Sequence, residues 1–193
     1  GWFTPRVNGE PRLKKPPLLY WAIMLTYKTF GINLFAARIW GVLSGAALAA
    51  CSCLLYRELF RKSGLLAGLI TLATLTVAIE GRRAMLDLPL ALFTAMAVYF
   101  AFKWGKSGRL GWILLSAFSL SLSFLVKGPV GIILFTVAAF SALWVFGKWQ
   151  FMISHWRQVF LALALLLAVS LPWPLTMAQL WPEFTRVLDN EVA

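Results

Sequence analysis

The sequence predicts an all-α fold, a polytopic bundle of transmembrane helices. Three observations predict it: 61% of the 193 residues are hydrophobic, 13% are charged, and the mean hydropathy is +0.79. Soluble domains have about 45–50% apolar and about 25% charged residues, so this chain has too few charges to cover a water-exposed surface. Intrinsic disorder is excluded as well, because it requires low hydrophobicity.

The apolar runs predict about six spans and one interfacial helix. A helix needs about 20 apolar residues to cross the hydrocarbon core, within a range of about 17–25. Leu18–Tyr27 is too short for that and is bounded by Lys15 and Lys28, so we expect it to lie in the interface or re-enter the membrane. Six runs approach the required length: Ile39–Tyr56, Gly64–Ile79, Ala84–Phe102, Leu110–Val126, Gly128–Phe146 and Val159–Ala178.

We expect one transmembrane domain across residues 1–193. Residues 1–38 would form an extracytoplasmic loop with the interfacial helix, residues 39–178 the six spans, and residues 179–193 the start of the next extracytoplasmic loop. The chain begins at Gly1 without an initiator Met and ends in a polar stretch. These features predict a fragment of a longer membrane protein.

The charges predict which side faces the cytoplasm. Alternating spans place 10 of the 18 Lys and Arg residues on the side of the N-terminal segment and 8 on the other, so the positive-inside rule alone does not decide. Glu58 is the sole acidic residue of the second side. Short, almost purely basic loops are typical of a cytoplasmic face, which predicts that the first side is exterior. The net charge of +11 therefore indicates orientation and lipid-headgroup contacts, not nucleic-acid binding.

Several residues have structural interpretations. The spacings Gly41-Val-Leu-Ser-Gly45 and Gly64-Leu-Leu-Ala-Gly68 predict close helix packing. Cys51 and Cys53 lie in an apolar run without neighbouring ligands, so we expect buried small side chains. The sequence has no zinc-ligand spacing and leaves dependence on a divalent metal open, and we expect a solvated role for His155. An interfacial aromatic belt is expected at the span ends, from Trp112, Trp144, Trp149, Trp173 and Trp181.

Asp87 is the clearest candidate for chemistry. An ionisable group at membrane depth is costly unless it is paired or hydrated, and it is a functional candidate for that reason. Asp87 follows Arg83 by four residues, so an Arg–Asp pair on one helix face is available. Two interpretations remain open: a structural ion pair at a helix end, or a carboxylate that positions a substrate or a metal or acts as a catalytic base.

Three lysines near the exterior side are candidates for binding an anion. Lys127 follows seventeen uncharged residues and precedes Gly128-Pro129, so a helix is expected to end there. A cation is favourable at a helix C-terminus, and the alternative is an anion-contacting Lys in a cavity. Lys14 and Lys15 precede Pro16-Pro17 at an expected helix N-terminus, where free N–H groups and Lys together make a phosphate site. Contact with lipid headgroups is the other interpretation of these two.

These residues also carry a family likeness. The segment Asn8-Gly-Glu-Pro-Arg-Leu-Lys-Lys15-Pro-Pro-Leu-Leu-Tyr-Trp21, followed by Phe30-Gly31 and Ala37-Arg38, resembles the polyprenyl-phosphate-dependent membrane glycosyltransferases of the GT-C fold. These are the protein O-mannosyltransferase and aminoarabinose transferase relatives. The Arg82–Asp87 stretch, the Val-Lys127-Gly128 step and Leu171-Pro-Trp173 recur in the same order, so the likeness spans essentially the whole chain.

The resemblance implies an enzyme that transfers a sugar from a polyprenyl (undecaprenyl) phosphate donor on the exterior face of a bacterial inner membrane. The acceptor would be a protein, lipid A or a glycan. The resemblance implies no firm cofactor besides the donor and leaves a divalent metal open. Asp87 would be a secondary candidate for the base. The resemblance further implies that the family's Asp-Glu catalytic motif precedes Gly1, so this fragment alone would be inactive. Contacts to the donor phosphate would come from Lys15, Lys14, Arg82, Arg83 and Lys127, and Glu191 would begin the next acidic segment.

Two other classes remain as alternatives. A transporter or flippase for an anionic lipid or a lipid-linked sugar would use the same cations without chemistry, and it would show inverted repeats with broken helices in matched halves. A structural membrane subunit would leave the ordered matches at Lys15, Asp87 and Lys127 unexplained. The sequence therefore favours the glycosyltransferase.

Overall fold

The computed structural model describes residues 6–7, 10–11 and 15–181. Within this part of the chain, the strands β1 (Arg6–Val7) and β2 (Glu10–Pro11) form one short antiparallel pair, and all other regular structure is helical. This confirms the predicted all-α fold. The helices are α1 (Leu18–Phe30), α2 (Leu34–Phe60), α3 (Leu65–Ala73), α4 (Leu75–Glu80), α5 (Asp87–Ser107), α6 (Leu110–Lys127), α7 (Val130–Phe146), α8 (Trp149–Ser154), α9 (Trp156–Ser170) and α10 (Pro172–Leu180).

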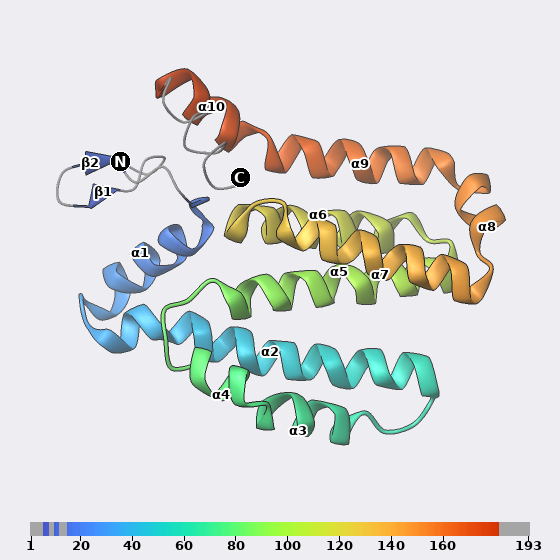
Figure 1. The fold of residues 1–193 in the computed structure, drawn as a ribbon, viewed down its shortest axis with the longest axis horizontal. Coiled ribbons are helices and arrows are strands. Elements are labelled where there is room, and N and C mark those ends of the chain that lie inside the picture. Colours follow the sequence, from blue (N-terminus) through green and yellow to red (C-terminus); the bar gives the residue numbers. More distant parts are fainter. Residues whose placement is uncertain (1–5, 8–9, 12–14, 182–193) are drawn as a thin grey trace.

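The long helices run side by side, with α5 and α6 at the centre of the bundle (Figure 1). Helix α5 packs against α2, α6 and α7, and α6 also packs against α9. Helices α3 and α4 lie along α2 at the edge of the bundle, while α1 crosses one end (Figure 1). Apolar side chains cover much of the outer surface, as expected for helices that face lipid.

Four helical segments of the described chain are long and apolar enough to cross a membrane: Leu34–Phe60, Asp87–Ser107, Leu110–Lys127 and Trp156–Leu180. They correspond to four of the six expected spans. The fifth is α7, which has 17 residues. Helix α1 has 13 residues, which is too short to span and agrees with the expected interfacial or re-entrant helix.

The expected span Gly64–Ile79 is two short helices, α3 of nine residues and α4 of six. The break lies at Thr74, whose backbone is extended at φ −61° and ψ 126°. Two threonine hydroxyls in this region donate hydrogen bonds to backbone carbonyls four residues earlier. Thr71 Oγ1 donates to Ala67 O at 2.9 Å, and Thr74 Oγ1 donates to Ile70 O at 3.0 Å. Such contacts compete with the backbone ladder and bend helices. Apolar length alone could not reveal this break.

The last expected span is interrupted between α9 and α10. Pro172 begins α10 directly after Leu171, and α10 turns away from the axis of α9 (Figure 1). Proline has no N–H to donate to the preceding turn, which accounts for the change of direction. Trp173 is buried in a cluster with Leu125 and Met177, so its assignment to the interfacial belt is wrong. Trp144, in contrast, is 74% exposed.

The predicted glycine spacings do mark close helix packing. A Cβ added at Gly41 would lie 2.8 Å from Arg83 O, because α2 packs directly against the turn that follows α4. A Cβ added at Gly68 of α3 would meet Cys53 Sγ of α2. Cys51 and Cys53 are both free thiols; Cys51 is buried, as the sequence predicts, whereas Cys53 is only partly buried. Glycine thus sets the spacing between α2 and the α3–α4 pair.

Candidate functional site: two cavities at one end of the bundle

The first feature of the site is an ion pair between the ends of two central helices. Asp87 is the first residue of α5 and Lys127 is the last residue of α6. Lys127 Nζ lies 2.5 Å from Asp87 Oδ1, and the side chains are 32% and 46% exposed. Each charge is also favourable at its own helix end, the carboxylate at an N-terminus and the ammonium at a C-terminus. The pair is therefore reachable from the membrane surface.

Gly128 fixes where Lys127 stands. Its backbone has φ 71° and ψ −146°, a conformation that residues with a Cβ rarely adopt. Its N–H donates to Phe124 O, and Pro129 follows, so α6 cannot continue. The predicted helix end at Lys127 is confirmed.

The sequence-predicted contact between Arg83 and Asp87 is wrong. Helix α5 begins only at Asp87, so Arg83 lies in the preceding turn and does not share a helix face with the carboxylate. Arg83 instead approaches Glu80, with Nη1 and Oε1 3.7 Å apart. The partner of Asp87 comes from forty residues further along the chain, which a local spacing rule could not find.

Lys15 stands at the same end of the bundle as this pair. It lies three residues before α1, and Leu18, the first residue of α1, packs against the cluster of Leu125, Trp173 and Met177. Leu125 in turn precedes Lys127 by two residues on α6. Lys14 and Glu191, the other two candidates near the chain ends, lie outside the described residues.

An apolar cavity of about 300 Å³ opens between α1, α2, α5 and α6. Val126, which precedes Lys127, and Pro89, which follows Asp87 by two residues, both line it. The cavity thus reaches the helix ends that carry the ion pair. Trp40 also lines it, and its indole Nε1 is buried without a hydrogen-bond partner. The other lining residues are Leu18, Leu19, Trp21, Ala22, Leu25, Ser44, Phe93 and Leu122.

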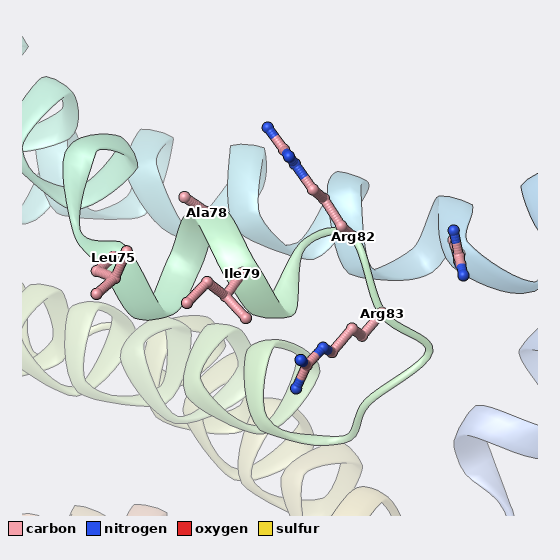
Figure 2. Close-up of a pocket in the computed structure, with 6 residues that line it drawn as sticks. Leu75, Ala78, Ile79, Arg82 and Arg83 are labelled. Carbon is pink, nitrogen blue, oxygen red and sulfur yellow. The ribbon is translucent and has the colours of Figure 1, made fainter.

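A second cavity, of about 490 Å³, lies between α2 and α4. Arg82 and Arg83 line it from the turn after α4, together with Leu75, Ala78 and Ile79 of α4 (Figure 2). Arg38 of α2 completes its lining. Arg38 was not predicted as a site residue from the sequence, although an arginine at the start of a long apolar run was a usable indication. The predicted set of donor cations is thereby divided between two places.

The described residues hold no group of three or more His, Cys, Asp or Glu side chains that could bind a metal ion. Among the described residues, this end offers positively charged side chains, the partly exposed carboxylate of Asp87 and an apolar cavity beside them. Positive groups at a membrane boundary suit a phosphate, and an apolar cavity below suits a hydrocarbon chain. Fold and site together define a polytopic helical membrane protein with an amphipathic, phosphate-compatible site at one membrane boundary.

Comparison with known proteins identifies the family. The family described as dolichyl-phosphate-mannose-protein mannosyltransferase matches residues 14–173, and the chain belongs to this family. The match includes Lys15, Arg38, Asp87 and Lys127. The predicted membership of the polyprenyl-phosphate-dependent glycosyltransferases of the GT-C fold is therefore confirmed.

The similar proteins include enzymes and solved structures. The chain is 30% identical over 187 residues to an undecaprenyl phosphate-alpha-4-amino-4-deoxy-L-arabinose arabinosyl transferase of Pseudomonas aeruginosa, covering 91% of this chain and 33% of that one. It is 34% identical over 137 residues to an uncharacterized protein of Aquifex aeolicus, covering 69% of this chain and 27% of that one.

Crystal structures of ArnT from Cupriavidus metallidurans, in the apo state and bound to undecaprenyl phosphate, superpose with a TM-score of 0.81 at 26% identity. They cover 95% of this chain and 35% of theirs. The chain thus spans about a third of the length of these relatives.

Proposed function

We propose that the protein transfers a sugar from a polyprenyl-phosphate donor to an acceptor at the exterior face of a bacterial inner membrane. One observation carries this proposal: in a chain of this family, the Lys127–Asp87 pair lies beside an apolar cavity that is lined by the neighbouring residues Val126 and Pro89. The similarity to an ArnT that was crystallised with undecaprenyl phosphate supports a lipid phosphate of this kind.

In this proposal the donor lies along α1, α5 and α6, with its first prenyl units in the apolar cavity. Lys15 and Lys127 would then contact the phosphate, and Lys14 would contribute from the segment before Lys15. As the acceptor's oxygen or nitrogen forms a bond to the anomeric carbon, the bond between that carbon and the phosphate oxygen breaks, which leaves added negative charge on the departing polyprenyl phosphate. Ammonium groups held at that point stabilise this charge, which is the usual electrostatic contribution of an enzyme to such a step.

Asp87 is placed to act on the acceptor. Its carboxylate is 46% exposed while one oxygen is held by Lys127, so the other oxygen is available to a hydroxyl or amine. We propose that it orients the acceptor group and serves as a secondary base, with Glu191 belonging to a further acidic segment of the site. A positioned base contributes about 10²–10⁴-fold to a rate. The acceptor in this proposal is a protein, lipid A or a glycan that offers such a hydroxyl or amine.

Sugar transfer by the complete protein, reconstituted with a polyprenyl-phosphate-linked sugar, tests the proposal. Lys15→Ala should weaken binding of polyprenyl phosphate and lower transfer at least about tenfold, the change expected on losing one charge-assisted contact. Lys62→Ala removes the same charge from an exposed position at the other end of the bundle. It should leave lipid binding and sugar transfer unchanged. If Lys15→Ala binds the lipid as the wild type does, the donor site is assigned wrongly. Movement of the lipid between leaflets without any transfer would favour the flippase instead.

A further inference from the structure

The cavity between α2 and α4 joins positive and apolar walls. Its polar wall consists of Arg38, Arg82 and Arg83, and its apolar wall of Leu75, Ala78 and Ile79. Arg82 and Arg83 leave the turn after α4 in different directions, one on each side of the chain (Figure 2). All three arginine side chains are exposed. They can therefore turn toward a ligand that enters the cavity.

The positive charge of this cavity is poorly compensated by the described residues. Among them, Arg38 and Arg82 form no ion pair with a carboxylate, and Arg83 has only the 3.7 Å contact with Glu80. Glu80 Oε2 is buried without a hydrogen-bond partner, so this carboxylate offsets one charge at most. Three guanidinium groups against one carboxylate favour an anion, and guanidinium groups match phosphate oxygens in geometry.

Close packing by Gly41 holds the two parts of the cavity together. A Cβ at Gly41 would lie 2.8 Å from Arg83 O, 3.1 Å from Gly81 O and 3.2 Å from Glu80 O. Gly41 follows Arg38 by three residues, so both lie on the same face of α2. The turn that carries Arg82 and Arg83 is thus fixed beside Arg38 by backbone contact.

The apolar wall continues into the side of the bundle. Leu75 is 72% exposed and Ile79 is 40% exposed, and the exposed leucines of α3 extend this surface away from the arginines. Positive charge at the helix end with an exposed apolar strip below it matches the two parts of a membrane lipid. A soluble anion would use the arginines alone and leave the apolar wall uncovered.

From these contacts we infer that Arg38, Arg82 and Arg83 bind the headgroup phosphate of an anionic membrane lipid other than the polyprenyl donor. The acyl chains of this lipid lie against Leu75, Ile79 and the outer face of α3. The site is separate from the Lys127–Asp87 pair, and none of its lining residues lines the apolar cavity beside that pair. Binding of this lipid requires no sugar transfer. The lipid site can therefore be absent while the proposed function is correct, and it can be present while the proposed function is wrong.

Photocrosslinking of the complete protein in bilayers locates such a lipid. The probe is phosphatidylglycerol with a photoreactive group on its headgroup, and crosslinked peptides are mapped by mass spectrometry. We expect crosslinks in the segment from Leu75 to Arg83. The triple variant Arg38→Gln, Arg82→Gln, Arg83→Gln should reduce them at least about tenfold, because it removes every charge-assisted contact. Arg82→Gln alone, at an exposed position without an ion pair, should reduce them severalfold and guards against misfolding of the triple variant.

The control is Arg109→Gln, which removes one exposed arginine at the opposite end of the bundle and should leave these crosslinks unchanged. Excess unlabelled phosphatidylglycerol should compete, whereas polyprenyl phosphate and inorganic phosphate should not. Equal crosslinking of this segment in wild type and triple variant would overturn the inference. Competition by polyprenyl phosphate would assign the arginines to the donor, and competition by inorganic phosphate would show an anion site without a lipid. Either result would also overturn it.

Discussion

At the scale of single residues, substitutions in the Lys127–Asp87 pair should affect sugar transfer much more than they affect stability. Both side chains are partly exposed, and ion pairs in such surroundings contribute about 0–1 kcal/mol to stability. Lys127→Met should therefore lower the free energy of unfolding by no more than about 1 kcal/mol. If Lys127 contacts the departing phosphate, the same substitution should lower transfer by about 10²-fold, as losing one donor to developing negative charge does elsewhere. Thermal melting and initial rates of transfer measure the two effects.

Asp87→Asn and the double variant complete this experiment. When two residues act as a unit, their effects on a rate are not additive. The double variant Asp87→Asn, Lys127→Met should then transfer sugar about as slowly as the worse single variant. Fully multiplied losses would show that the two side chains act independently, which contradicts the arrangement proposed for the site.

Gly128 offers a second prediction for a single residue. A Cβ at φ 71° and ψ −146° is strained, so Gly128→Ala should destabilise the protein by about 1–3 kcal/mol. Gly105→Ala is a matched control, because Gly105 lies inside α5 and an added Cβ there meets nothing within 4 Å. That substitution should be neutral or stabilise by up to about 1 kcal/mol, since alanine favours a helix. Melting temperatures in one detergent compare the two, and equal shifts would contradict the strain assigned to Gly128.

Between elements, contact of α2 with α3 depends on the absence of a side chain at Gly68. A Cβ there would meet Cys53 Sγ and would lie 3.0 Å from Ala49 O, so Gly68→Ala should separate the helices and lower the melting temperature. Adding Cys53→Ala removes the sulfur but not the carbonyl contact. The double variant should thus recover part of the lost stability, and a double variant no more stable than Gly68→Ala would contradict this packing.

Several helices and helix ends could be predicted from the sequence alone. Helices α2, α5 and α6 follow directly from long apolar runs, and the ends at Lys127 and before Leu18 follow from Gly-Pro and Pro-Pro pairs. The break at Thr74 was missed because an extended backbone at a single residue leaves the hydropathy of the run unchanged. The charged residues of the site, and the end of the bundle at which they lie, were predictable from the sequence, because charges at membrane depth are rare.

Partners in the site were not predictable, because they depend on packing between distant segments. Arg83 was expected to contact Asp87, four residues away, yet the partner is Lys127. Arg38 joins Arg82 and Arg83 through the contact of Gly41 with a turn forty residues later. A single sequence shows the length and spacing of apolar runs clearly, but it does not show which helices pack against each other.

For the whole molecule, the combined length of α3 and α4 bears on whether the two helices cross the membrane together. Together with Thr74, the nine residues of α3 and the six of α4 cover sixteen residues, or about 24 Å at the rise of a helix, against a hydrocarbon core of about 30 Å. The turns at their two ends lie at opposite ends of the bundle (Figure 1). Charged residues occupy both turns, so each end can remain at a polar boundary while the bilayer thins locally. We predict that the pair completes a crossing.

Thiol labelling in intact cells tests this crossing and the orientation together. In a background with Cys51→Ala and Cys53→Ala, Ala84→Cys places a thiol in the turn after α4, and Lys62→Cys places one in the turn before α3. A membrane-impermeant maleimide should label the first in intact cells and the second only after permeabilisation, because the basic loops predict that the second turn faces the cytoplasm. The reverse result would invert the predicted orientation. Labelling of both from one side would show that α3 and α4 re-enter without crossing, and the bundle would then have one span fewer than the sequence predicts.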